Sequence, residues 1–219
     1  MYLIANIIVC VCALAGFIYG GIRFFRPGKA LYAQMITLSL GCIAFGRLFN
    51  IVRLLTGGNL TEHFQLGFLG LIGSLMFFFS ANYGTVDSLL DDRSKEFTKY
   101  RLIALAAPVA AILMYVGLFL LSEVSDLWKI MGAVLTVFVM VASYFNLKHL
   151  IFPDVDFGVV KCLRPYNLLA LIYSVSIFVE SCALSRNNEL LTFICCCVTG
   201  LVTAAIIPTV VRGIAKWKI

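Results

Sequence analysis

The chain has 219 residues, of which 62% are hydrophobic and only 13% are charged. A soluble domain contains roughly 45–50% apolar and about 25% charged residues, so this composition excludes a water-soluble fold and predicts a membrane protein. The net charge of +6 does not indicate nucleic-acid binding, because the Lys and Arg residues are spread over separate loops and form no continuous basic stripe.

Seven apolar stretches have the length of about 20 residues that a helix needs to cross a bilayer. They lie at Leu3–Ile22, Ala30–Leu55, Phe64–Val86, Leu102–Ser122, Leu127–Leu147, Tyr166–Leu184 and Leu190–Val211. We expect helices because the runs lack polar alternation and because a backbone in lipid must satisfy its own hydrogen bonds. The sequence therefore predicts one all-α, polytopic transmembrane domain over residues 1–219, with the first span retained and not cleaved as a signal peptide.

The loops predict the orientation of these spans. Most of the 17 Lys and Arg residues fall in the loops after spans one, three and five and in the C-terminal tail, whereas the other loops carry the acidic residues Glu62, Glu123 and Asp126. Basic loops stay on the cytoplasmic side. We therefore expect the N-terminus outside and the C-terminus in the cytoplasm, in a multi-pass protein of the plasma membrane.

Small residues at four-residue or three-residue spacing mark helix faces that pack closely. Gly16 and Gly20 form such a pair in the first span, and a stripe of Gly67, Gly70 and Gly73 follows in the third. These patterns predict close helix contacts.

Spans one to three and five to seven share an orientation and suggest an internal repeat. In both triplets a longer proline-containing loop precedes the middle span, and each middle span carries one intramembrane charge, Arg47 in the first triplet and Glu180 in the second. A 3+1+3 arrangement of parallel repeats would follow, with the fourth span as linker.

Arg47 and Glu180 are predicted to lie at comparable depth, and ionisable groups inside a membrane are candidates for function. Two interpretations stand side by side. In the first, the two charges neutralise each other and lock two helices together. In the second, they line an outward-facing cavity, where the planar guanidinium of Arg47 binds an anionic group and Glu180 binds a cationic group or carries a proton.

Three further residues are candidates for the same ligand site. Asn50 and Arg53 follow Arg47 at three-residue steps, which places Asn50 on the same helix face. Arg53 is close enough to the interface that its side chain is also expected to extend into water. Asn6, which enters the first span from the outside, completes the predicted set.

A second polar set is predicted toward the cytoplasm and consists of Asn82, Tyr83, Asp87, Asn146 and Asn167. These residues would line the inner mouth of a transport route, or else anchor the helices at the interface.

The acidic residues Asp87, Asp91 and Asp92 suggest a divalent-cation site. The alternative is a solvated helical extension of the third span.

Other kinds of chemistry lack the residues they need. His63 and His149 are predicted on opposite sides of the bilayer, which argues against a bis-histidine haem or a multi-histidine zinc site. Most of the eight cysteines lie inside predicted spans and are expected to act as small apolar side chains. We therefore expect no cofactor and no metal.

The sequence favours a carrier or ligand-binding membrane protein for a small organic anion or zwitterion, and an enzyme is less favoured. The alternatives are an intramembrane enzyme that acts on a lipid-linked substrate, or a non-catalytic sensory or scaffold subunit. Expected partners are the lipid bilayer and a small-molecule ligand, with a second copy or another membrane subunit possible.

Overall fold

The computed structural model of the chain is an all-α bundle, and it describes residues 1–61, 64–87, 91, 94–153 and 159–216. The helices are α1 (Tyr2–Phe24), α2 (Leu31–Leu55), α3 (Leu66–Asn82), α5 (Thr98–Ala104), α6 (Ala106–Tyr115), α7 (Asp126–Ile151), α8 (Val159–Ser185) and α9 (Glu189–Lys216). Two π-helical turns, η1 (Tyr83–Asp87) and η3 (Val116–Leu120), continue α3 and α6, and the short 3₁₀ turn η2 (Lys95–Phe97) precedes α5.

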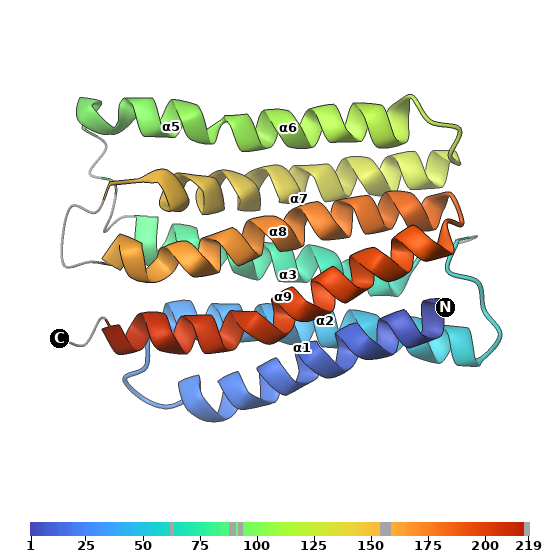
Figure 1. The fold of residues 1–219 in the computed structure, drawn as a ribbon, viewed down its shortest axis with the longest axis horizontal. Helices are drawn as coiled ribbons and strands as arrows, with labels where there is room; N and C mark the ends of the chain where they lie inside the picture. Colours follow the sequence, from blue (N-terminus) through green and yellow to red (C-terminus); the bar gives the residue numbers. More distant parts are fainter. Residues whose placement is uncertain (62–63, 88–90, 92–93, 154–158, 217–219) are drawn as a thin grey trace.

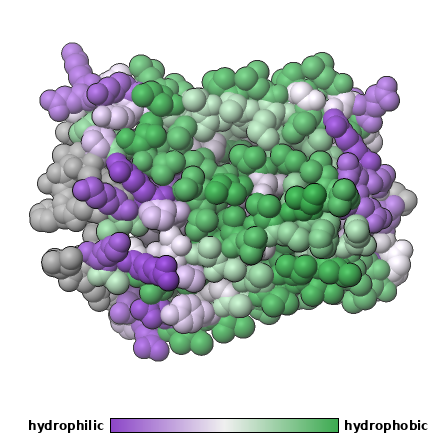
Figure 2. Space-filling view, viewed as in Figure 1, coloured by the Kyte–Doolittle hydropathy of each residue, from purple (hydrophilic) through white to green (hydrophobic). Residues whose placement is uncertain are grey.

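Length and surface character identify this bundle as a helical membrane protein. Six helical stretches within the described residues are long and apolar enough to span a membrane, and α5, α6 and η3 together form one of them. The seventh helix, α3, has 17 residues, which is at the lower limit for a crossing. Figure 2 shows an apolar band across the face in view, with hydrophilic residues gathered at its two ends.

By their contacts, α1–α3 and α7–α9 form a closed ring, and the α5–α6 segment lies at one edge of the bundle (Figure 1). Going round the ring, α1 contacts α2, α2 contacts α3, α3 contacts α7, α7 contacts α8, α8 contacts α9, and α9 returns to α1. The α5–α6 segment packs against α7 at the periphery. The chain ends lie at opposite ends of the bundle, which we name the amino-terminal end and the carboxy-terminal end.

The fourth predicted span is interrupted where the sequence contains a proline. α5 ends at Ala104 and α6 begins at Ala106, and Pro108 has no amide hydrogen to donate to the carbonyl of Ala104, four residues earlier. The sixth predicted span begins too late, because α8 starts at Val159 and contains Pro165 inside the helix.

The contact between α2 and α3 depends on glycines that let the two backbones approach closely, as their spacing predicts. A Cβ atom added to Gly70 would lie 2.6 Å from the carbonyl oxygen of Cys42 and 2.7 Å from the Cα of Gly46. A Cβ on Gly67 would overlap the side chain of Asn50. This close packing fixes where Asn50 and the start of α3 lie.

Gly70→Ala is expected to lower the free energy of unfolding by roughly 1–3 kcal/mol, the usual result of overpacking a tight contact. The clash is with backbone atoms, which cannot rotate away. The matched control is Gly21→Ala in α1, because a Cβ there meets nothing within 4 Å. The measurement is the thermal unfolding midpoint of the purified protein in detergent. Equal midpoints for the two variants would contradict the close contact between α2 and α3 at Gly70.

Candidate functional site

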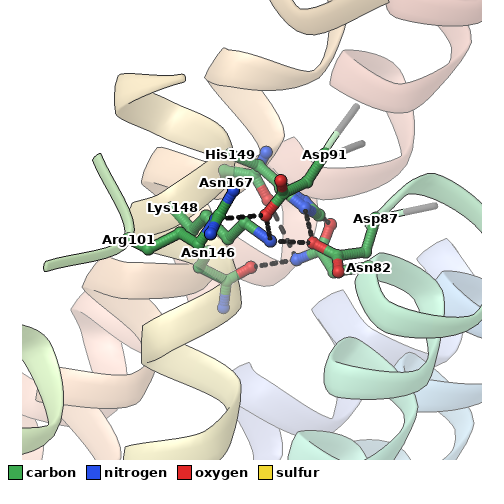
Figure 3. Close-up of polar contacts among 8 residues, drawn as sticks. All are labelled: Asn82, Asp87, Asp91, Arg101, Asn146, Lys148, His149 and Asn167. Atoms are coloured by element: carbon green, nitrogen blue, oxygen red, sulfur yellow. Dashed lines mark hydrogen bonds and ion pairs between the residues drawn. The ribbon is translucent and has the colours of Figure 1, made fainter. Parts of the chain in front are cut away.

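Polar residues gather at two levels of the bundle, and most of them are buried. Near the amino-terminal end lies the group that we name the Arg47 site, made of Asn6, Arg47, Asn50, Gln65 and Glu180. Near the carboxy-terminal end lies a second group, the His149 cluster, made of Asn82, Asp87, Asp91, Arg101, Asn146, Lys148, His149 and Asn167 (Figure 3).

An ion pair between α2 and α8 forms the centre of the Arg47 site. The Nη2 of Arg47 donates to Oε2 of Glu180 at 2.7 Å, and its Nη1 donates to Oε1. The two residues are only 3% and 5% exposed. The two intramembrane charges therefore meet, as in the ion-pair interpretation of the sequence, in the bidentate geometry that a guanidinium and a carboxylate favour.

Two more helices contribute to this pair. The Oδ1 of Asn6 in α1 accepts hydrogen bonds from Arg47 Nη1 and from Asn50 Nδ2, both at 3.3 Å. The Sγ of Cys196 in α9 lies 3.8 Å from Arg47 Nη1. The guanidinium thus holds four helices, α1, α2, α8 and α9, at one level of the bundle.

A small cavity of about 20 Å³ adjoins the ion pair, with room for a single water molecule. Its polar lining is formed by Arg47, Asn50, Gln65, Glu180 and Ser181. Three buried polar atoms of these residues, Arg47 Nε, Asn50 Oδ1 and Gln65 Nε2, have no hydrogen-bond partner among the described residues. A buried polar atom without a partner is costly, so these atoms are suited to receive a water or a ligand.

One predicted member of the ligand site lies elsewhere. The Nε of Arg53 donates to the backbone carbonyl of Asn59 at 2.9 Å, at the exposed end of α2. The structure therefore brings together Asn6, Arg47, Asn50 and Glu180 from the sequence prediction, adds Gln65, and leaves Arg53 outside. No sequence signal pointed to Gln65, which is the residue directly before α3 and whose side chain lines the cavity.

Three asparagines join α3, α7 and α8 in the His149 cluster. The Nδ2 of Asn82 donates to Oδ1 of Asn146 at 2.6 Å and to Oδ1 of Asn167 at 3.0 Å. All three are fully buried. The ring of fully buried His149 lies next to them, with Nδ1 3.2 Å from Asn82 Oδ1 and Nε2 3.1 Å from Asp87 Oδ1.

Two cations balance the carboxylates of this cluster. Lys148 Nζ lies 2.6 Å from Asp87 Oδ1 and 2.7 Å from Asp91 Oδ2, and Arg101 Nε lies 3.0 Å from the same Asp91 oxygen. Burial alone would raise the pKa of Asp87, but its hydrogen bonds with His149 and Lys148 and the charge of Lys148 outweigh this, so the pKa of Asp87 lies below its usual value.

These pairings bear on two earlier predictions. Asp91 is buried and ion-paired, so it is not part of a solvated extension, while Asp92 lies outside the described residues. A divalent cation at Asp87 and Asp91 would be repelled by Lys148 and Arg101.

Tyr83 does not belong to the hydrogen-bonded cluster. It is 56% exposed, and its ring stacks on Phe79 at a centroid distance of 5.2 Å. The sequence prediction also missed Lys148, His149 and Arg101. His149 follows the predicted Asn146 by three residues, a spacing that places both on one helix face and could have identified it.

Comparison with protein-family models, with curated protein sequences and with solved structures finds no match to this chain. Its function must therefore be inferred from the geometry of its own residues.

Breaking the buried ion pair on one side is expected to be far more damaging than removing it entirely. Arg47→Ala leaves Glu180 buried without a partner and should lower the free energy of unfolding by about 3–5 kcal/mol. The double variant Arg47→Met with Glu180→Leu buries no charge and should recover most of that loss. Thermal unfolding of both variants in the same detergent tests this, and equal loss in the two would argue against a buried pair.

Proposed function

We propose that the chain is an integral membrane carrier or ligand-binding protein for a small organic anion or zwitterion, which binds at Arg47, Asn50, Gln65 and Glu180. The observation that supports this most directly is the buried ion pair beside a cavity with three unpartnered polar atoms. A pair that served packing alone would be expected to have its remaining hydrogen-bonding atoms satisfied.

The chemistry of binding is an exchange of partners at Arg47. A ligand carboxylate takes over the guanidinium, which offers the planar fork that matches it, and releases Glu180. A zwitterion then keeps both charges paired, because its ammonium group binds the freed Glu180. A simple anion requires Glu180 to take up a proton instead, since an unpaired buried carboxylate is strongly unfavourable.

The ring contacts support a division into two three-helix halves, α1–α3 and α7–α9. When α1, α2 and α3 are exchanged with α7, α8 and α9, the contacts α1–α2, α2–α3 and α9–α1 become α7–α8, α8–α9 and α3–α7, all of which occur. Arg47 and Glu180 lie in the middle helix of each half. We propose that the halves are parallel repeats with α5–α6 as linker, and that they move against each other about the site.

Movement is required because the cavity holds no more than a water molecule. We propose that this is the closed state, and that the site opens at the amino-terminal end. That end faces outward in this proposal, because basic residues concentrate at the opposite end and basic loops stay in the cytoplasm.

Ligand binding can be tested by thermal shift on the protein in nanodiscs, with a panel of free amino acids and small monocarboxylates as probes. A ligand at a hundredfold excess over its Kd stabilises by about 2.7 kcal/mol. We expect at least one probe to raise the unfolding midpoint, and its uptake into proteoliposomes to follow. Arg47→Lys keeps the charge but loses the fork and should abolish the shift for every probe. Glu180→Gln removes the carboxylate that would bind an ammonium group, so it should abolish the shift for amino acids but keep it for monocarboxylates.

The matched control is Arg53→Lys, the same change on the same helix outside the site, which should keep the shift. The proposal fails if no probe shifts the midpoint, or if both site variants respond as the wild type does.

A further inference from the structure

The ring of His149 has oxygen atoms on both sides. Its Nδ1 lies 3.2 Å from Asn82 Oδ1 and its Nε2 lies 3.1 Å from Asp87 Oδ1 (Figure 3). A neutral imidazole carries a proton on only one nitrogen, and an ionised carboxylate can only accept. Both contacts are hydrogen bonds at the same time when the ring carries two protons.

The orientation of Asn82 follows from its other contacts. Its Nδ2 donates to the side-chain oxygens of Asn146 and Asn167, which leaves Oδ1 facing the ring. In a neutral ring the one proton stays on Nε2, which faces the carboxylate of Asp87, so Nδ1 has a lone pair that needs a donor. The amide of Asn82 would then have to turn over, and the amides of its two asparagine partners with it. The Nδ2 atoms of Asn146 and Asn167 have no partner among the described residues in the present arrangement and would then donate to Asn82.

Among the described residues of the cluster, His149 is the group whose protonation sets the net charge. Asp87 at the end of η1 and Asp91 are balanced by Lys148 of α7 and Arg101 of α5, while the side chains presented by α3 and α8, Asn82 and Asn167, are uncharged. A neutral ring leaves the cluster neutral, and one added proton gives it a single positive charge. Imidazole is the side chain that makes this change near physiological pH.

We propose that His149 and Asp87 form a proton-binding site, and that the bound proton is the coupling ion of the carrier. The second part rests on the proposed function. Uptake forms one N–H bond at Nδ1 with a proton from solution, release returns that proton to solution, and no electrons are transferred. The proton reverses the direction of the asparagine hydrogen bonds between α3 in one half of the bundle and α7 and α8 in the other.

The proton site can be tested without any ligand by nitrogen NMR of the protein labelled at histidine. The chain has 2 histidines, so His63→Gln leaves the signals of His149 alone. Between roughly pH 5 and 8 we expect the ring to change from protonated on both nitrogens to protonated on one. A single ring form at every pH in this range would overturn the proton site.

Two substitutions show whether Asp87 shares the proton. Asp87→Asn removes the carboxylate that faces Nε2, so the doubly protonated ring should be lost at a pH where the wild-type ring has it. The control is Asp126→Asn at the exposed start of α7, the helix that carries His149, which should leave the ring unchanged. Identical ring signals in Asp87→Asn and Asp126→Asn would exclude Asp87 from the site.

Coupling to the Arg47 site can be measured at Cys196, whose thiol contacts Arg47. A variant that retains only Cys196 is treated with a membrane-impermeant thiol reagent at pH 5.5 and at pH 8, with and without His149→Gln. Both proteins carry the same thiol, so its own pH dependence cancels in the ratio of their rates. We expect the ratio of the two rates to change by at least about fivefold between pH 5.5 and pH 8, which is the lower end of ordinary coupling between two sites.

The possible failures can be told apart. A constant ratio overturns the coupling role of the proton, whereas no reaction at Cys196 under any condition overturns the opening on which the proposed function depends. Neither result changes what the NMR titration reports about the proton site itself.

Discussion

The buried pair of Arg47 and Glu180 is the constraint on which the packing near the amino-terminal end of the bundle depends. A lone charge at the centre of a membrane helix costs roughly 2.5–3.5 kcal/mol on insertion scales, so Arg47 in α2 and Glu180 in α8 each carry such a cost until the two charges meet. Their pairing fixes the depth of one helix against the other. Asn6 and Cys196 then bring α1 and α9 to the same level, and the glycines of α3 leave the room that Asn50 needs.

A group of buried aromatic rings adjoins the two polar levels. The ring of Phe78 lies 5.3 Å from that of Tyr173 and 6.1 Å from that of Tyr166, which in turn contacts Tyr32 at 5.5 Å. All four rings are buried, and the hydroxyl of Tyr173 is hydrogen-bonded to Ser74 of α3 at 2.7 Å. In sequence, Phe78 precedes Asn82 by about one helical turn and Tyr173 lies between Asn167 and Glu180, so these two rings fill the interior between the polar levels.

The sequence predicted the features that lipid enforces. The seven apolar runs and the pairing of Arg47 with Glu180 follow from physics that allows few alternatives, because backbone groups and charges in hydrocarbon must be satisfied internally. The members of the His149 cluster were only partly predictable. Lys148 and His149 lie where α7 nears the interface, so their sequence position is equally compatible with exposure to water; only the contact of α7 with α3 turns them inward.

The strength of the central ion pair depends on whether water is present. Two unit charges at 4 Å attract by about 1 kcal/mol in water and by several times more in a protein interior, so the pair resists separation while it is buried and separates readily once hydrated. In the proposed exchange of partners, hydration would therefore have to come first. The unpartnered atoms of Asn50 and Gln65 line a cavity that already fits one water molecule, which makes this the place where water would first reach the pair and begin to weaken it.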